Sequence, residues 1–325
     1  MPRPNRGDVH VNRLLTRFAV KPILKPRMFA AGEIFPLCPV EKQSDNYAVY
    51  DTGDLLRDEA KERAPSTESA GGNYDIDTSP MYACRNYAFH KDVDDDTADN
   101  ADQPIDSYKD AMQYCIQKLL IKRERIFIAN FVKASVWTTN MTGVASGPST
   151  NQFTRWSASG STPVADVDEW CNIIEGLTGE WPNVLAIAPD VLSALKTNDD
   201  IVGRIKYTQK GIITTDILAE LFDLEKVVVL RGVYNTAKKG AATSVSRMTS
   251  GQAILTYAAP RPSTENYSGG YIFAWKGRYG SNKVGARVKR YRMEELNGER
   301  VEAELSFDAR IVAPDMGVYA SSVVA

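Results

Sequence analysis

The residue types that usually perform catalysis or bind metals are sparse in this chain and are not arranged for either task. Its two histidines, His10 and His90, lie in an N-terminal arm and in a loop, so they complete neither a zinc-binding H-E-x-x-H motif nor a Ser-His-Asp set. The four cysteines are widely scattered and include no C-x-x-C pair, which disfavours a zinc site and a disulfide framework. We therefore expect no catalytic residue, no metal and no cofactor.

Loops that bind nucleotides or calcium are also missing. The sequence has no G-x-x-x-x-G-K-[ST] or G-x-G-x-x-G motif, and the glycine-bearing run GRYGSNKVG is predicted to be a hairpin. Asp92, Asp94 and Asp96 match the start of an EF-hand loop, but Thr97 replaces its turn glycine and Gln103 its bidentate glutamate. We interpret this run as a solvated acidic approach to a helix N-terminus, with a looser cation site as the alternative.

One long amphipathic stretch is the element around which the other segments must be arranged. From Ile105 to about Trp137, apolar residues recur at intervals of three, four and seven, which predicts a helix with one broad buried face. Pro104 suits a first helical turn, and Ser107 with Asp110 can form a capping box. At about 1.5 Å per residue the helix would be roughly 45 to 50 Å long and would cross a whole domain. A coiled coil is the weaker alternative, because no heptad pattern continues beyond it. The residues expected on its apolar face are Ile105, Tyr108, Met112, Cys115, Ile116, Leu119, Leu120, Ile126, Phe127 and Phe131, and those on its polar face are Gln113, Lys118, Lys122, Arg123, Arg125 and Lys133.

Composition and charge indicate an ordinary soluble chain with an uneven charge distribution. The N-terminus lacks the apolar core of a signal peptide, and no apolar run approaches the roughly 18 residues that span a bilayer, so we expect no membrane contact. Residues 1–27 carry seven bases and one acid, residues 41–102 carry 16 acids and 6 bases, and residues 276–292 carry seven bases and no acid. Such segments suit contacts between copies of the chain, and separate solvated faces are the alternative. The cationic arm could also contact nucleic acid phosphates without reading sequence, unless it forms salt bridges with the acidic segment instead.

The first ninety residues are predicted to form an extended arm and a projecting hairpin. Prolines repeatedly interrupt residues 1–45, so no helix can continue there. Apolar alternation at 47–52 and again at 74–89 predicts two strands. The run between them, DTGDLLRDEAKERAPSTESAGGN, is too polar to bury a core and should project as a long loop. Loops of this length are uncommon and are usually functional.

The second half of the chain is predicted to contain a small mixed α/β layer followed by antiparallel sheet, which makes the fold class α+β. Residues 138–162 are small and polar and are expected to be a solvated connection. Helices are then expected at 164–177, 189–195, 201–205 and 216–222, and strands at 184–188, 226–230, 253–257 and 270–275. The alternating tail, 284–312, should turn at Asn297-Gly298 and pack beside the long helix.

The order of these segments and three stretches of residues resemble the major capsid proteins of tailed phages, which have the HK97 fold. The stretches are EIFPLCPVEKQSDNYAVYD, LLRDEAKERAPSTESAGGNYDI and GRIKYTQKGIITTDILAELFDLEKVVVLRGVYNTA. The order of elements extends the resemblance over nearly the whole chain. The parts that it implies are an N-terminal arm (1–45), an extended E-loop hairpin (46–90), a P-domain with the spine helix (91–162), an axial A-domain (163–265) and the C-terminal sheet of the P-domain (266–325).

The resemblance implies a structural subunit and not an enzyme. Such a subunit self-assembles into hexamers and pentamers, which form the icosahedral or prolate head shell around phage double-stranded DNA. Implied partners are other copies of the chain, a scaffold, a portal, optional decoration proteins and nonspecifically bound DNA, with assembly in the host cytoplasm and a final location in the virion. No scaffold-like coiled segment precedes the arm, which leaves a separate scaffold or a cleaved propeptide open. The alternatives are an encapsulin-like nanocompartment and, in another class, a small-molecule α/β enzyme built on residues 163–260, for which we find no convergent polar pocket.

Three groups of residues are expected to lie at contacts between copies. They are Arg57, Asp58, Glu59, Lys61, Glu62 and Arg63 of the E-loop, Lys206, Tyr207, Gln209 and Lys210 near the centre of each capsomer, and Arg13, Arg17 and Lys21 of the arm. The arm, or the basic strand that carries Arg287, Lys289 and Arg290, is expected to face the acidic stretch 51–62 of another copy.

Overall fold

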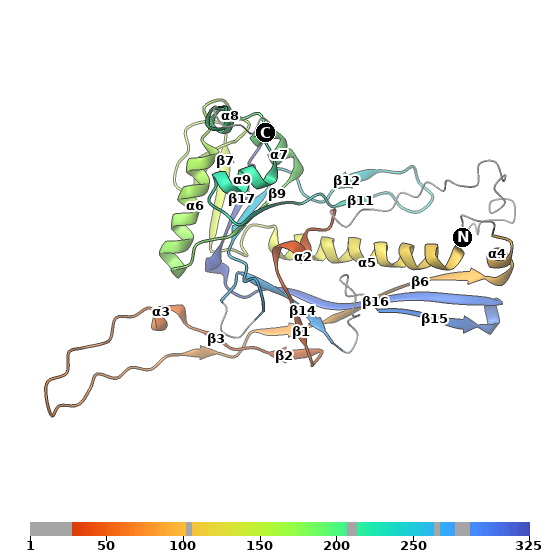
Figure 1. Cartoon of the computed structure of the whole chain (residues 1–325), viewed down its shortest axis with the longest axis horizontal. Coiled ribbons are helices and arrows are strands. Elements are labelled where there is room, and N and C mark those ends of the chain that lie inside the picture. Colours follow the sequence, from red (N-terminus) through yellow and green to blue (C-terminus); the bar gives the residue numbers. More distant parts are fainter. Residues whose placement is uncertain (1–27, 102–105, 207–212, 263–266, 277–286) are drawn as a thin grey trace.

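The computed structural model describes residues 28–101, 106–206, 213–262, 267–276 and 287–325. Figure 1 shows three parts: a long helix, α5, that lies along a sheet; an α/β unit at one end of that helix; and a hairpin that projects away from both. Helices and sheets are thus mixed without a regular βαβ alternation, which agrees with the predicted α+β class.

Helix α5 (Ser107–Phe131) has 25 residues, so at about 1.5 Å per residue it is about 37 Å long, shorter than predicted. Pro104 and Ile105 lie outside the described residues. The predicted capping box is wrong, because the carboxylate of Asp106 accepts the backbone N–H bonds of residues 108 and 109 and so caps the helix itself. At the other end, the indole N–H of Trp137 donates to the carbonyl of Phe131 at 2.8 Å, where the chain turns back.

The buried face of α5 changes along its length. Cys115 and Leu119, in the first half, are buried against the sheet as predicted, whereas Met112 is exposed. In the second half, Arg123 is buried, which corrects its expected place on the polar face, and Glu124 is buried beside it. The cause is a turn of the arm, α2 (Ala31–Ile34), that covers this part of the helix and is held by the Glu124 carboxylate.

The sheet beneath α5 has five strands in the described part of the chain, in the order β1-β14-β16-β15 with β6 along the other edge of β16. Its strands are β1 (Leu37–Val40), β6 (Arg85–Asp94), β14 (Gly270–Trp275), β15 (Arg287–Met293) and β16 (Gly298–Ile311). Alternate residues of β16, from Val301 to Phe307, are buried on the α5 side. The predicted antiparallel tail is therefore confirmed. Its turn is longer than predicted. Met293 is the last residue of β15 and pairs with Gly298, the first of β16, so the turn consists of the 3₁₀ helix η2 (Glu294–Leu296) and Asn297.

The α/β unit is built on a six-stranded sheet with the order β10-β9-β13-β17-β7-β8. Its strands are β7 (Thr139–Val144), β8 (Gln152–Thr154), β9 (Val184–Ile187), β10 (Lys226–Val229), β13 (Ala253–Thr256) and β17 (Gly317–Ser321). Its helices are α6 (Pro163–Thr178), α7 (Pro189–Leu195), α8 (Asp199–Ile205) and α9 (Thr215–Leu221), and the short 3₁₀ helix η3 (Pro314–Met316) precedes β17. The predicted helices and buried strands of this unit are confirmed, and Gly179, at φ 74°, ends α6 in the left-handed conformation that favours glycine.

The expected solvated connection at 138–162 is wrong. This segment supplies β7 and β8, and it buries Phe153 and Trp156, whose rings pack against Trp170 of α6. The end of the chain, β17, lies in the middle of the same sheet. The predicted boundaries after residue 162 and before residue 266 therefore do not follow the sheets, because two distant segments pair with the α/β unit.

The projecting hairpin, defined here as residues 44–83, is the predicted pair of strands with a long connection. Strand β2 (Ser44–Asn46) pairs with β5 (Met81–Ala83), and β3 (Val49–Tyr50) pairs with β4 (Ile76–Asp77). A short helix that was not predicted, α3 (Thr52–Leu55), follows β3. The remaining elements are α4 (Asp95–Asp99) before α5, and a second, smaller hairpin of β11 (Val233–Asn235) and β12 (Val245–Arg247). No helix in the described ranges is both long and apolar enough to cross a membrane.

Candidate subunit-contact surfaces

The projecting hairpin is fixed at its base and along its first half. The Asp308 carboxylate of β16 accepts the backbone N–H of Ala83 at 2.9 Å, which ties the returning strand to the sheet. Further out, the Asp54 carboxylate accepts the N–H of Asp75 across the hairpin at 3.0 Å, and the Asp51 side chain caps α3. These bonds hold the two limbs of the hairpin together. At α3 the Thr52 hydroxyl still lies 3.3 Å from the Tyr267 hydroxyl, and beyond α3 the hairpin extends away from the body (Figure 1).

The end of the hairpin contains the predicted charged residues, and half of them interact locally. Arg57 lies 3.0 Å from Asp54 and 3.3 Å from Glu59, and Arg63 donates to the carbonyl of residue 67. The other three are exposed and form no ion pair within the described residues: Asp58, Lys61 and Glu62. Their contact with another copy stays a prediction.

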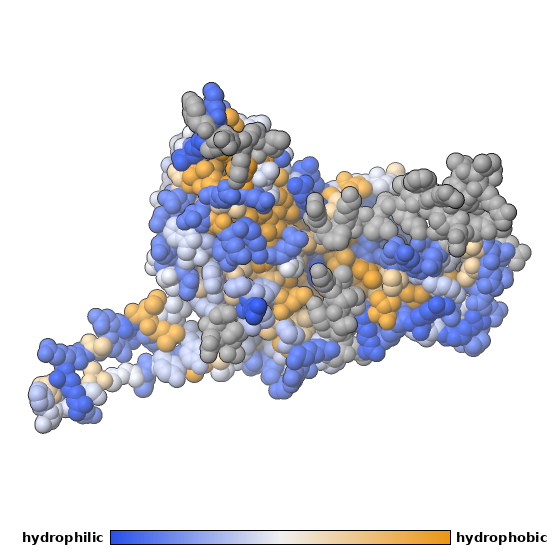
Figure 2. All heavy atoms as spheres, viewed as in Figure 1, coloured by the Kyte–Doolittle hydropathy of each residue, from blue (hydrophilic) through white to orange (hydrophobic). Residues whose placement is uncertain are grey.

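Exposed apolar side chains near α3 are a feature of the hairpin that sequence reasoning missed. Leu55 is 62% exposed, Leu56 64% and Tyr74 57%, and the Tyr74 ring lies 5.7 Å from that of Tyr50. Figure 2 shows hydrophobic atoms gathered at α3, whereas the end of the hairpin is hydrophilic. A pair of adjacent leucines inside a charged loop was the available signal. Exposed apolar groups on a projecting element typically mark a protein contact.

The other two predicted groups are described only in part. Lys206 is exposed directly after α8, and Figure 1 places α8 at the end of the α/β unit that lies away from α5. Its predicted neighbours Tyr207, Gln209 and Lys210 lie outside the described residues, as do the arm residues Arg13, Arg17 and Lys21. Their positions in an assembly remain predictions.

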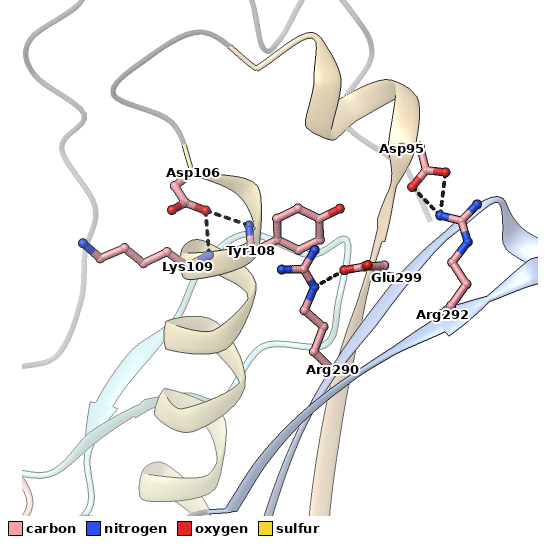
Figure 3. A network of polar contacts seen from close by, with 7 residues as sticks. All are labelled: Asp95, Asp106, Tyr108, Lys109, Arg290, Arg292 and Glu299. Atoms are coloured by element: carbon pink, nitrogen blue, oxygen red, sulfur yellow. Dashed lines mark hydrogen bonds and ion pairs between the residues drawn. The ribbon is translucent and has the colours of Figure 1, made fainter.

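The basic strand β15 meets acids of its own chain at Lys289 and Arg290, whereas the expected pairing with another copy stays a prediction. Figure 3 shows Arg290 pointing to Glu299, beneath the Tyr108 ring. It also shows Arg292 pointing to Asp95, whose two carboxylate oxygens lie 2.6 and 2.7 Å from one guanidinium nitrogen. On the opposite face of the sheet, Lys289 lies 2.6 Å from Glu304. Acids at diagonal positions of the neighbouring strand, or at α4, satisfy these cations, and a search for sequence blocks of opposite charge does not reveal such pairs.

The acidic run before α5 serves local structure. Asp92 forms two bonds with Arg300, at 2.7 and 3.0 Å, and the Asp94 side chain accepts from Thr97 and so caps α4. Among the described residues, no group of three His, Cys, Asp or Glu side chains is placed to hold a metal ion.

Two carboxyl groups are partly or fully buried inside the subunit. Burial raises the pKa of Asp166 to about 6, although the indole N–H of Trp156, 2.8 Å away, counteracts the shift by stabilising the carboxylate. Burial likewise raises the pKa of Glu124, while the N–H groups of Ala30 and Ala31, at 3.0 and 3.1 Å, oppose that effect. These groups belong to internal contacts of the fold and lie in no catalytic arrangement.

Comparison with known proteins gives one sequence relative of partial coverage. The chain is 32% identical over 80 residues to a major capsid protein of Burkholderia phage BcepMu, a match that covers 25% of this chain and 26% of that protein. The matched part is thus about a quarter of each chain. No protein-family model matches.

Solved structures are similar over almost the whole chain. A phage-related protein from Bordetella bronchiseptica RB50 aligns with a TM-score of 0.67 and 19% identity, over 92% of this chain and 94% of that one. An encapsulin from Synechococcus elongatus PCC 7942 aligns with a TM-score of 0.57 and 12% identity, over 97% and 98% of the two chains. The capsid of cyanophage P-SCSP1u gives 0.56 and 11%, over 98% of each. The chain therefore has the HK97-like fold of phage capsids and an encapsulin, and it resembles a phage major capsid protein in sequence.

Proposed function

We propose that this protein is the major capsid subunit of a tailed phage. Copies of it would assemble into hexamers and pentamers and form an icosahedral or prolate head shell around double-stranded DNA. The observation that carries the proposal is the projecting hairpin, which extends from a shell-type fold and exposes the side chains of Leu55, Leu56 and Tyr74 to water. The projecting hairpin adds no buried core to an isolated subunit, whereas a neighbouring copy could bury these side chains.

Within this proposal the subunit is structural and performs no catalysis. The hairpin of each copy rests on its neighbour, and the segment after α8, beginning at Lys206, lies near the centre of each capsomer. The N-terminal arm adds further contacts between copies. A scaffold, a portal and double-stranded DNA are the proposed partners during assembly in the host.

Deletion of the hairpin end tests this function. A variant that lacks residues 57–72 should remain a folded, soluble subunit, because these residues make no contact with the core, but it should not close shells. Sedimentation velocity and negative-stain electron microscopy of parent and variant measure this directly. Normal shells from the deletion variant would refute the role of the hairpin, and a parent that stays monomeric under all assembly conditions would refute the function.

The encapsulin-like compartment is the second candidate, because the encapsulin structure aligns over as much of the chain as the phage capsid does. The contents of the particle separate the two functions. Shells recovered from infected or induced cells should contain double-stranded DNA if the subunit is a capsid protein. Shells that contain a cargo protein and no nucleic acid would favour the compartment.

A further inference from the structure

One face of the subunit presents cations that its own acids do not neutralise. Lys118, Lys122 and Arg125 lie at i, i+4 and i+7 of α5, so they share one side of the helix, and all three are exposed. The smaller hairpin, β11–β12, runs beside α5 on the side away from the five-stranded sheet (Figure 1), and the Arg125 guanidinium lies 4.6 Å from the Tyr234 ring of β11. The contact joins helix and hairpin into one surface.

The smaller hairpin, with Arg231 two residues before β11, adds four exposed cations to this surface. Residues 226–262 contain no Asp or Glu, and α5 contains only one acid after Asp110, the fully buried Glu124. Glu33 of α2, which is close enough to raise the pKa of Glu124, is an acid at the border of the surface. We call this surface the cationic face. Its seven members are Lys118, Lys122, Arg125, Arg231, Lys238, Lys239 and Arg247.

The partners of these cations show that the face is unsatisfied within one subunit. In the described ranges none of the seven forms an ion pair, and Lys118 and Lys122 lie over the rings of Tyr114 and Tyr87, at 5.2 and 5.6 Å. A cation over an aromatic ring keeps N–H donors free for an anion. Like charges this close repel one another, so binding of a polyanion would stabilise the surface.

The opposite face of the sheet is different. Arg290 faces α5, so its neighbours in β15, Lys289 and Tyr291, face away from the helix. There Lys289 meets Glu304, Tyr291 donates to Glu302, and Arg300 meets Asp92. Arg287 stands opposite Glu304 in the ladder, so each cation named on this side has an acid beside it and the charge is balanced within the subunit. One face of the molecule therefore attracts anions and the other does not.

We propose that the cationic face binds the phosphate backbone of double-stranded DNA and is the side of the subunit that faces the shell interior. That this side faces the shell interior rests on the proposed function, whereas DNA binding itself can be measured on free subunits. Phosphate contacts need exposed Lys and Arg without a fixed register, which this face supplies. An acidic protein segment is the other anion that could bind here. Its exposed apolar side chains, Tyr114 of α5 and Val245 of β12, lie on different elements, and the seven cations outnumber them. A specific protein contact would use a continuous apolar centre, so we favour nucleic acid.

Fluorescence anisotropy with a random-sequence DNA duplex of about 30 base pairs tests the proposal. The test variant is Lys118→Gln/Lys122→Gln/Arg125→Gln, and the matched control is Arg287→Gln/Lys289→Gln/Arg300→Gln, which removes the same charge from the balanced face. Near 0.1 M salt the test variant should bind DNA about 10²- to 10³-fold more weakly, and its slope of log K against log salt should fall by about 2 to 3. The control should stay close to the parent.

A second variant, Lys238→Gln/Lys239→Gln, keeps the test decisive if the first does not fold, because these loop residues contact no core side chain. It should lower the salt slope by about 2. Equal losses in the control and test variants, or no DNA binding by the parent, would overturn the proposal. So would test variants that bind DNA normally but fail to assemble, since the face would then bind protein. Shell formation is scored separately by electron microscopy. If the parent binds DNA, the test variant binds it more weakly and the parent forms no shells, the proposed function is refuted and the DNA-binding surface is not.

Discussion

Replacement of Leu55 and Leu56 by serine should weaken the shell and leave the subunit intact. Full burial of a leucine side chain contributes about 1.5 to 3 kcal/mol. Because these two are 62% and 64% exposed in the subunit, a neighbour that covers them would add about 1 to 2 kcal/mol each, or about 2 to 4 kcal/mol for every hairpin. Both side chains are mostly exposed in the subunit, so the same substitutions should change its own free energy of unfolding by less than about 0.5 kcal/mol.

A urea titration followed in two ways measures both quantities. Light scattering reports dissociation of particles, and tryptophan fluorescence reports unfolding of subunits. The control is Asp58→Ser/Lys61→Ser, which changes two exposed charges near the end of the same hairpin, where each exposed pair is worth only about 0 to 1 kcal/mol. The reasoning is refuted if the leucine variant dissociates at the parent's urea concentration, or if its subunits lose as much stability as its particles.

Further predictions concern the interior of the subunit and the salt response of the shell. Leu119→Ala should lower the free energy of unfolding by about 2 to 5 kcal/mol and Lys122→Ala by less than about 0.5, and equal urea midpoints for the two variants would show that the buried face of α5 is wrongly assigned. The raised pKa of Asp166 means that its stabilising contribution is full below the ordinary value of 3.8 and is lost as pH rises through about 6. Asp166→Asn should therefore flatten the melting temperature between these pH values, and curves parallel to the parent's would contradict this. Glu124→Gln replaces the charged acceptor of the N–H groups of residues 30 and 31, so hydrogen exchange of these two amides should quicken roughly ten- to a hundredfold. Unchanged exchange would show that apolar packing alone holds the arm. Molar sodium chloride should leave particle melting unchanged or raise it if the apolar hairpin contact dominates, and should lower it if ion pairs between copies dominate.

Periodicity predicted the elements that are organised by local patterns. The helix around Leu119 and the strand at 184–187 follow from apolar spacing alone, because each buries one continuous face. The limits of α5 were less predictable, since they depend on single side chains: the Asp106 carboxylate at its start and the Trp137 indole at its end. Periodicity contains no information about such caps.

Long-range pairing accounts for most of the remaining errors. Phe153 and Trp156 lie in a run of small polar residues, and only their packing against Trp170 of the α/β unit makes that run part of a core. Arg123 looked like a surface residue because the arm segment that covers this part of α5, and that Glu124 holds, is some ninety positions away in the sequence. Tertiary contacts of this kind override local composition.

Charge patterns identified the candidate surfaces only in part. The excess of bases in 276–292 suggested a contact between copies, yet Lys289, Arg290 and Arg292 find acids on adjacent strands or at α4. Among the described residues, the seven members of the cationic face form no ion pair, and their sequence positions do not reveal this. Leu55 and Leu56 could have been identified from sequence, since two leucines in a charged loop are unusual.

Cryo-electron microscopy of particles assembled from the purified full-length chain tests the central claim most directly. The account predicts closed shells built from hexamers and pentamers, in which Leu55 and Leu56 of each copy are buried against a neighbouring copy and the cationic face lines the interior. A chain that forms only small open oligomers, or a shell whose projecting hairpins stand free in solvent, would contradict it.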